Sequence, residues 1–175
     1  MSRRDPLANP EDLIRRVHSY VAYRVGDGPD AQDITSDTFE RALRGRDTYD
    51  SRKGTPTAWL LGIARRCVSD AMSRPVTLVP ETPDWPAGGN LEQEAVTRMS
   101  LATAISALDE REQDLLALRY GADLTAKRIG ELLDLKTNAV EVALHRALVR
   151  LRGLLDPETE NAPDDAPAEA APVEP

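Results

Sequence analysis

The sequence predicts an all-α protein made of two small helical domains. Large aromatic side chains are scarce in the 175 residues, with one Phe, two Trp and four Tyr, and this composition favours small helical bundles over sandwiches or barrels. Apolar residues recur every three or four positions in two stretches, separated by a segment rich in proline. No alternation of strand and helix patterns is visible, which excludes a receiver-type α/β domain in the N-terminal half.

The N-terminal stretch predicts three helices. Asn9 is placed to cap the first, which begins at Pro10 and ends at Gly26. The second runs from about Asp30 to about Arg44, and the third starts at Thr55 and Pro56 and stops before Pro75. The residues expected to face the core of the second and third helices are Ile34, Thr38, Phe39, Ala42, Leu43, Leu60, Ile63, Ala64, Cys67, Val68 and Ala71.

The C-terminal stretch predicts a helix-turn-helix. Thr125 can cap a short helix, a turn follows at residues 134–136 with Leu135 buried inside it, and Thr137 can cap a longer helix. Two helices in this relation place the second one in the major groove of DNA. The apolar row expected to pack the longer helix comprises Val140, Leu144, Ala147, Leu148 and Leu151.

The formal net charge of −8 is unevenly distributed along the chain. Residues 156–175 hold seven acidic and no basic side chains together with five prolines, so we expect a disordered acidic tail. Residues 75–90 contain four prolines and a Gly-Gly pair, typical of an extended linker. Neither folded half is strongly basic, and tight binding to DNA by the chain alone is therefore not expected.

The second helix carries a row of carboxylates. Asp30, Asp33, Asp37 and Glu40 are spaced by three or four residues and so share one helix face. One interpretation is a solvated face, which is the ordinary role of charged residues on a helix. The other is a surface that docks on a basic partner, since charges of a single sign suit complementary recognition.

The third helix and the loop before it combine aromatic and basic residues. The loop holds Tyr49, Arg52 and Lys53, and the helix holds Trp59, Arg65 and Arg66. Stacking faces with interleaved cations are what unpaired bases and their phosphates require, so this combination favours contact with single-stranded DNA. Trp59 can alternatively serve as a core residue.

Several functions are disfavoured. No His–carboxylate pair, glycine-rich phosphate loop or nucleophile elbow is present, so we expect no catalysis and no cofactor. Cys67 is the single cysteine, which excludes an internal disulfide and a cysteine-cluster metal site. No run of about 18 apolar residues suggests a membrane span, and without a signal-peptide pattern we expect the chain in the cytoplasm, associated with the nucleoid.

Two multi-part motifs carry a family resemblance. The segment D-A-Q-D-I-T-S-D-T-F-E-R-A-L at residues 30–43, followed by Y-D-S-R-K-G-T-P-T-A-W-L-L-G-I-A-R-R-C at 49–67, resembles conserved region 2 of the extracytoplasmic-function (ECF) bacterial sigma factors. The segment L-D-E-R-E-Q-D-L-L-A-L-R-Y at 108–120, continuing into the helix-turn-helix, resembles their region 4. The resemblance implies domains at residues 1–74 and 91–155, joined by a linker at 75–90 and followed by a tail at 156–175. It also implies that the two domains stay largely separate until they dock on RNA polymerase.

The resemblance also implies partners and site residues. The partners are the clamp helices and flap of core RNA polymerase, promoter DNA and, where one exists, an anti-sigma factor. Residues matching the polymerase-binding surface are Gln32, Asp33, Ser36, Asp37 and Glu40. Residues matching the surface for the single-stranded −10 element are Tyr49, Arg52, Lys53, Trp59, Arg65 and Arg66. Residues matching the helix that enters duplex DNA at the −35 element are Lys136, Thr137, Asn138, Glu141, His145, Arg146 and Arg150.

This chain departs from the family pattern on the −35 helix. Glu141 and Ala143 stand where basic residues are usual, and Val142 stands where a small polar residue is usual; Arg66 replaces a common Asn in the other domain. The predicted function is promoter recognition and strand opening for RNA polymerase. Two alternatives remain: an autonomous helix-turn-helix regulator, and a polymerase-bound interaction protein that no longer reads DNA.

Overall fold

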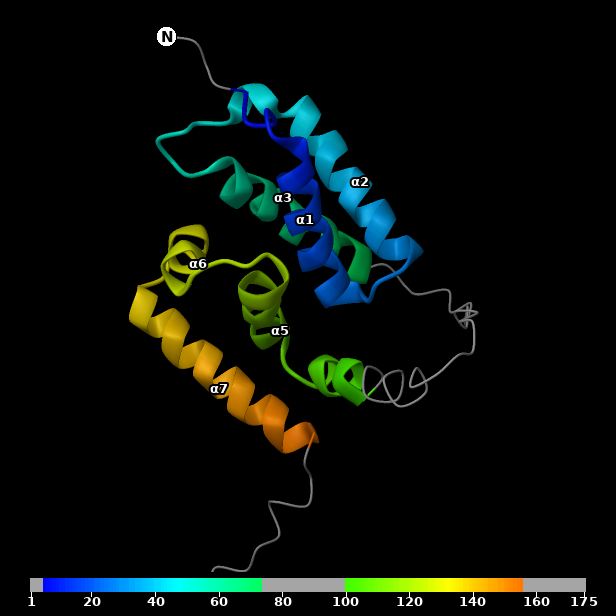
Figure 1. Ribbon diagram of the computed structural model, residues 1–175, viewed down its shortest axis with the longest axis vertical. Helices are drawn as coiled ribbons and strands as arrows, with labels where there is room; N and C mark the ends of the chain where they lie inside the picture. Colours follow the sequence, from blue (N-terminus) through cyan, green and yellow to red (C-terminus); the bar gives the residue numbers. More distant parts are fainter. Residues whose placement is uncertain (1–4, 74–99, 156–175) are drawn as a thin grey trace, which may run out of the picture.

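The computed structural model describes residues 5–73 and 100–155, and all regular structure in these two segments is helical. Figure 1 shows α1, α2 and α3 as one group of helices and α5, α6 and α7 as a second group lying against it. The all-α prediction is confirmed. The linker predicted at residues 75–90 and the tail predicted at 156–175 lie outside the described residues.

The first group is a three-helix unit. It consists of α1 (Pro10–Val25), α2 (Pro29–Arg44), the short 3₁₀ helix η1 (Arg46–Thr48) and α3 (Pro56–Met72). Each of the three longer helices begins with proline, whose fixed φ and missing N–H suit the first helical turn. The core residues of the unit include Leu13, Val17, Tyr20, Val21, Ala31, Ile34, Ala42, Leu60, Leu61, Ala64, Cys67 and Val68.

Two details of this unit differ from the sequence prediction. Asn9 precedes α1, but its side chain makes no capping hydrogen bond. Leu43 was expected in the core and is 55% exposed. Its neighbour Ala42 is buried as predicted, and Leu43 lies about 100° further around the helix, on the outer side of α2. The buried polar side chains Thr35 and Thr38 satisfy their hydroxyls by donating to the carbonyls of Ala31 and Ile34.

The second group contains the helix-turn-helix. Helical residues at 100–106 lead into α5 (Glu110–Leu116), the π-helical turn η2 (Ala117–Gly121), α6 (Ala126–Leu133) and α7 (Thr137–Leu155). Asp109 and Glu112 form a reciprocal capping box at the start of α5, and Thr125 caps α6 by accepting from the amide of Arg128. Val140, Leu144, Ala147 and Leu151 are buried on α7 as predicted, whereas Leu148 is 37% exposed.

The turn between α6 and α7 depends on two backbone features. Asp134 adopts a left-handed conformation with φ 56°, and the amide of Leu135 donates to the carbonyl of Gly130. A Cβ at Gly130 would lie 2.6 Å from the Leu135 carbonyl oxygen, so the turn closes only over glycine. Leu135 is half-buried rather than fully buried, and Thr137 is the first residue of α7 rather than a cap before it.

The two groups share one hydrophobic core. Helix α1 packs against η2, and α3 packs against α6. A Cβ at Gly121 would lie 2.8 Å from the backbone carbonyl of Ser19, so glycine permits the close approach of η2 to α1. The family resemblance implied that the two domains stay largely separate. In the structure they are in contact, because the apolar residues 115–118 are buried in the shared core.

Candidate functional surfaces

The predicted polymerase-binding residues lie together on the outer face of α2. Gln32, Asp33, Ser36, Asp37 and Glu40 are all exposed, because the inner face of the helix is taken by its apolar residues. The structure therefore brings all five onto one surface. Their role in binding polymerase stays a prediction.

The charge of this α2 face is partly compensated inside the unit. Arg41 lies 3.7 Å from Asp37 and 2.8 Å from Asp70 on α3, and Arg44 pairs with Glu40 one turn away. The pKa of Arg41 is raised above its usual value, chiefly by the hydrogen bond to Asp70. Asp33 makes no ion pair with any residue in the described segments. The sequence did not identify Asp70, whose proximity to α2 depends on the packing of α3.

The loop before α3 is organised by its own side chains. The rings of Tyr49 and Trp59 have centroids 5.5 Å apart at 55°, and the Tyr49 hydroxyl donates to the carbonyl of Gly54 at 3.0 Å. Asp50 accepts from the backbone and guanidinium of Arg52, which lowers the pKa of Asp50 to about 2. The Arg52 side chain is 88% exposed. Solvent screens such an exposed pair, so a phosphate can replace the carboxylate at low cost.

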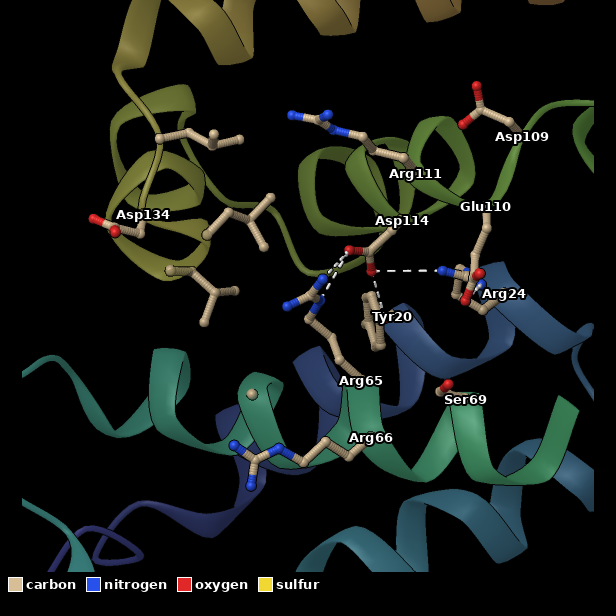
Figure 2. A pocket seen from close by; sticks show the side chains of 14 residues that line it. Tyr20, Arg24, Arg65, Arg66, Ser69, Asp109, Glu110, Arg111, Asp114 and Asp134 are labelled. Carbon is tan, nitrogen blue, oxygen red and sulfur yellow. Dashed lines mark hydrogen bonds and ion pairs between the residues drawn. The ribbon is translucent and has the colours of Figure 1, made fainter. Parts of the chain in front are cut away.

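The structure separates the two neighbouring arginines of α3. Arg66 is exposed, whereas Arg65 leaves α3 toward the second helical group and pairs with Asp114 on α5 (Figure 2). Trp59 is half-buried and packs against the core, so it has both a structural role and a partly accessible ring. One cleft of about 690 Å³ is lined by Tyr49, Arg52, Lys53 and Trp59, but not by Arg65 or Arg66. The role of these six residues in binding the −10 element stays a prediction.

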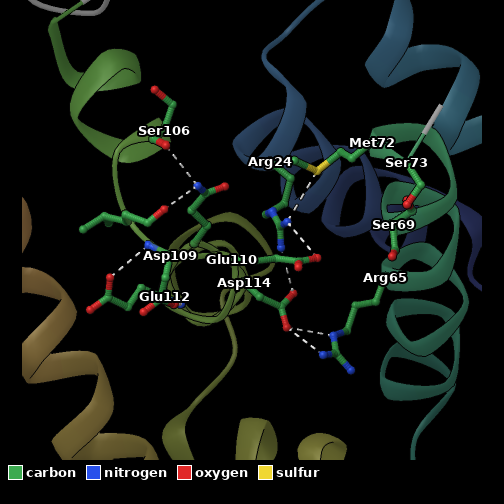
Figure 3. Close-up of polar contacts among 12 residues, drawn as sticks. Arg24, Arg65, Ser69, Met72, Ser73, Ser106, Asp109, Glu110, Glu112 and Asp114 are labelled. Carbon is green, nitrogen blue, oxygen red and sulfur yellow. Dashed lines mark hydrogen bonds and ion pairs between the residues drawn. The ribbon is translucent and has the colours of Figure 1, made fainter. Parts of the chain in front are cut away.

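Asp114 is the centre of a polar network that sequence reasoning missed. Its carboxylate accepts from the Tyr20 hydroxyl at 2.7 Å and from Nε of Arg65 at 2.8 Å. Nη1 of Arg24 lies 3.5 Å away, and Nη2 of Arg24 lies 3.9 Å from Glu110 (Figure 3). Burial and then the Asp114 charge raise the pKa of Tyr20 far above its usual value. A carboxylate amid a buried apolar run, D-L-L-A-L, is the one sequence signal that could have suggested such a contact.

The predicted −35 residues lie on the outer face of α7 and the turn before it. Lys136, Thr137, Asn138, Glu141, His145, Arg146 and Arg150 are all exposed. Lys136, Asn138 and Arg146 line a groove of about 500 Å³ between α7 and α5, together with Arg111. The sequence analysis did not include Arg111, which lies in the first turn of α5. The seven α7 residues remain predicted DNA contacts.

Arg150 is placed differently from the other basic residues of α7. Its Nη1 lies 3.3 Å from the carboxylate of Glu112 on α5, whose side chain is 17% exposed. Glu141 and His145 are exposed but do not line the groove of Arg111 and Arg146. Of the seven predicted residues, Lys136, Asn138 and Arg146 line the groove, and the other four do not.

Two general features of the described segments bear on function. None of their helices is long and apolar enough to cross a membrane. Within the same segments, no group of three or more His, Cys, Asp or Glu side chains is arranged to hold a metal ion.

Comparison with known proteins identifies the family. The sigma-70 region 2 model matches residues 11–75, and the sigma-70 region 4 model matches residues 104–153. The chain is 31% identical to the ECF RNA polymerase sigma factor ShbA of Streptomyces griseus, with 83% of this chain and 86% of ShbA covered. The chain belongs to the ECF RNA polymerase sigma factors. We therefore refer to α1–α3 as region 2 and to α5–α7 as region 4.

Other relatives agree with this assignment. This sigma factor is 31% identical to SigD of Mycobacterium tuberculosis, with 85% of this chain and 76% of SigD covered. It is 30% identical to BldN of Streptomyces coelicolor, with 86% of this chain and 57% of BldN covered. Two solved structures share the fold. CnrH in complex with the cytosolic domain of CnrY has a TM-score of 0.56 at 22% identity, with 84% of this chain and 82% of CnrH covered. The RpoE–NepR complex from Bartonella quintana has a TM-score of 0.57 at 16% identity, with 83% of this chain and 93% of the matched chain covered.

Proposed function

We propose that this sigma factor binds core RNA polymerase through α2 and directs it to promoters through two DNA-binding surfaces. The loop at residues 49–55 and α3 bind the single-stranded −10 element and support strand opening. Helix α7 and the preceding turn bind the duplex −35 element. The polymerase carries the chemistry of RNA synthesis, and we assign no catalytic step to this chain.

We further propose a division of labour along the chain. Residues 1–74 bind polymerase and the −10 element, 91–155 bind the −35 element, and 75–90 join the two. Residues 156–175 form an acidic extension that reduces non-specific binding to DNA, since like charges repel phosphates. The complex acts in the cytoplasm on the nucleoid.

The observation that carries this function is the presence of two different DNA-binding chemistries on one chain. Region 4 presents a helix-turn-helix whose outer face holds Lys136, Asn138 and Arg146. Region 2 presents an aromatic pair, Tyr49 and Trp59, beside the cations Arg52 and Lys53. An autonomous regulator of duplex DNA needs the first and has no use for the second.

Run-off transcription with purified core polymerase tests the function. Promoter fragments from a genomic library are transcribed by core enzyme alone, with this chain, and with the Asp33→Lys, Asp37→Lys double variant. We expect promoter-specific transcripts only with the unmodified chain. Core polymerase alone measures non-specific initiation, and the double variant measures dependence on the α2 face.

Each alternative gives a distinct result in the same assay. An autonomous regulator would bind duplex DNA specifically at physiological salt without polymerase and would yield no transcript with core enzyme. A polymerase-bound interaction protein would co-purify with core enzyme but direct no promoter-specific initiation. Either outcome would overturn the proposal.

An anti-sigma factor is a further proposed partner. Two proteins that share this fold were solved as complexes, CnrH with the cytosolic domain of CnrY and RpoE with the anti-sigma factor NepR. The test is to co-purify proteins with the tagged chain from its host and to add each purified candidate to the run-off assay. A true anti-sigma factor abolishes the promoter-specific transcripts without affecting initiation by core polymerase with another sigma factor.

A further inference from the structure

The groove between α5 and α7 gathers basic side chains that the described segments leave without an ion pair. Arg111, Lys136 and Arg146 line this groove and are exposed, and none of the three pairs with an acidic residue in the described segments. The one acid that lines the groove, Glu112, is already paired with Arg150. The groove therefore presents a concentrated positive charge that the described part of the chain does not neutralise.

The remaining lining of this groove is largely apolar. Leu115 of α5 is buried, and Ala143 of α7 is half-buried. Ala139 and Val142 of α7 are exposed, Val142 at 42%. A groove of this kind fits a ligand that combines several negative charges with small apolar groups.

The segment that follows α7 in the sequence has this composition. Residues 156–175 contain seven acidic side chains and no basic one, together with five prolines and five alanines. The acids supply negative charge, and proline and alanine supply small apolar groups. Proline also restricts the conformations of a free chain, so less conformational entropy is lost when such a segment binds.

The spacing of the acids matches the spacing of the bases in the groove. Lys136 and Arg146 are ten residues apart, which is about 15 Å along a helix. Glu160 and Asp165 are five residues apart, which is also about 15 Å in an extended proline-rich chain. Arg146 lies about 14 Å before Leu155, the end of α7, and Glu160 can reach about 15 Å beyond it. A segment that runs back along α7 therefore places Glu160 beside Arg146. By the same spacing it places Asp165 beside Lys136.

We propose that residues 156–175 fold back along α7 and dock in the groove of Arg111, Lys136 and Arg146, where their carboxylates occupy the places of DNA phosphates. Pro157 favours the reversal after Leu155, because the residue before a proline avoids the helical conformation. A short tether gives the segment an effective concentration in roughly the millimolar range at the groove. The docking concerns this chain alone, while its effect on promoter binding rests on the proposed −35 role of α7.

Docking weakens non-specific DNA binding more than promoter binding. Carboxylates and phosphates both form charge-assisted pairs with Arg and Lys, so the segment and DNA compete for the groove. When only a fraction of the grooves is empty, the observed dissociation constant is the intrinsic constant divided by that fraction. Non-specific duplex DNA must displace the segment with phosphate contacts alone. A promoter held by the holoenzyme also has its region 2 contacts, so it displaces the segment readily.

Zero-length cross-linking of the full-length chain with a carbodiimide tests the docking directly. The reagent joins a carboxylate to a lysine amine only where the two are in contact. The sequence has three lysines, Lys53, Lys127 and Lys136, and all three are exposed. We expect mass spectrometry to find carboxylates of residues 156–175 joined to Lys136, with Lys53 and Lys127 as internal controls that are joined far less. An excess of duplex DNA of random sequence should suppress the Lys136 product.

A variant with a second amine in the groove tests the direction of docking. Arg146→Lys keeps the charge and should be joined to Glu160, closer to α7 than the acids joined to Lys136. Equal yields at the three natural lysines, or no product at Lys136, would overturn the proposal. Products found only in cross-linked dimers, with a yield that rises with chain concentration, would place the segment on a second copy and would also overturn it.

Two charge-matched triple variants separate docking from general repulsion of DNA. The first lies within the matched spacing and comprises Glu160→Gln, Asp164→Asn and Asp165→Asn. The second lies outside it and comprises Asp156→Asn, Glu169→Gln and Glu174→Gln. Binding of each full-length chain to a fluorescein-labelled duplex of random sequence is measured by anisotropy.

We expect the first variant to bind this duplex about fivefold more tightly than the unmodified chain, as when the fraction of empty grooves rises from roughly a fifth to nearly all. The second variant should gain less than about twofold, because docking persists. Equal gains would mean that the segment repels DNA only through its total charge and would overturn the proposal. Run-off transcription with the unmodified chain tests the proposed function separately, because the cross-linking result does not depend on polymerase.

Discussion

Regions 2 and 4 differ in how far their predicted DNA-binding surfaces are free. On α7 of region 4, every predicted −35 residue is exposed, and Lys136, Asn138 and Arg146 line an open groove. In region 2, Arg65 is engaged by Asp114, and the cleft of Tyr49 and Trp59 faces α6. The predicted polymerase-binding face of α2 is exposed like the α7 face.

The comparison teaches that the availability of a surface can be set by the other half of the chain. The α2 and α7 faces are exposed in the described arrangement. Arg65 is instead paired with a carboxylate of region 4, although its side chain is 38% exposed.

The largest expected effect is the loss of polymerase binding on reversing the free α2 face. Asp33→Lys with Asp37→Lys should abolish association with core polymerase. Like charges that face each other across an interface weaken binding by roughly several kcal/mol. The fold should survive, since the Asp37 side chain is 54% exposed and Arg41 keeps its pair with Asp70. Co-purification with tagged core enzyme measures the effect.

The matched control changes the same total charge elsewhere on region 2. Glu11→Lys with Asp27→Lys alters two exposed acids that lie off the α2 face. This variant should co-purify with core polymerase at the level of the unmodified chain. Equal loss in both double variants would mean that overall charge, rather than the α2 face, governs association.

The next effect concerns the engaged surface of region 2. Tyr49→Ala with Trp59→Ala should spare polymerase binding and reduce open-complex formation, since stacking contributes about 1–3 kcal/mol per base. Permanganate reactivity of thymines at −10 is the measurement. Trp59 packs partly in the core, so circular dichroism must verify the fold. Unchanged thymine reactivity in a folded variant would assign the aromatic pair to structure alone.

A smaller effect is expected on the free surface of region 4. Arg146→Ala should weaken promoter binding by the holoenzyme about tenfold, or about 1.4 kcal/mol, and should lower the salt dependence by about one phosphate contact. Arg150→Ala is the comparison, because Glu112 already holds the Arg150 side chain. Gel-shift titration at several salt concentrations distinguishes the two. A larger effect at Arg150 than at Arg146 would contradict the assignment of the groove.

Each region could be predicted from its own sequence, because local signals determine it. Proline at the first turn of α1 and of α3, Thr125 as a cap and most of the apolar rows of α2, α3 and α7 appear in the structure as expected. The errors at Leu43 and Leu148 are of one kind. Each leucine was assigned to the core because it is apolar, whereas in the structure the preceding alanine, Ala42 or Ala147, faces the core.

The contact between the regions could not be predicted from periodicity. Asp114 accepts hydrogen bonds from Tyr20, 94 residues earlier in the chain, and from Arg65, 49 residues earlier. The local conformation at Gly121 does not require glycine. Glycine is needed there because a Cβ would collide with the backbone carbonyl of Ser19. Periodicity could not reveal the partner of Arg65, because Asp114 belongs to the other region.

The smallest effect concerns the hydroxyl at the centre of the contact. Tyr20→Phe removes one donor from Asp114, which keeps its two arginine partners, so the cost should be about 1 kcal/mol of unfolding free energy near neutral pH. Burial and the Asp114 charge raise the pKa of Tyr20 above its usual 10.0. A raised pKa gives stability that is fully present below the unfolded value and is lost as the pH rises above it.

The unmodified chain should therefore lose stability relative to Tyr20→Phe above about pH 10, by about 1.4 kcal/mol per pH unit from this residue alone. The variant should be the less stable protein at neutral pH and should equal or exceed the unmodified chain near about pH 11. Urea unfolding at both values measures the change. The most alkaline phase of the tyrosine absorbance titration should also vanish in the variant. A constant difference in stability across this range would mean that Tyr20 ionises as readily in the folded chain as in the unfolded one, and that the contact with Asp114 does not hold the phenol protonated.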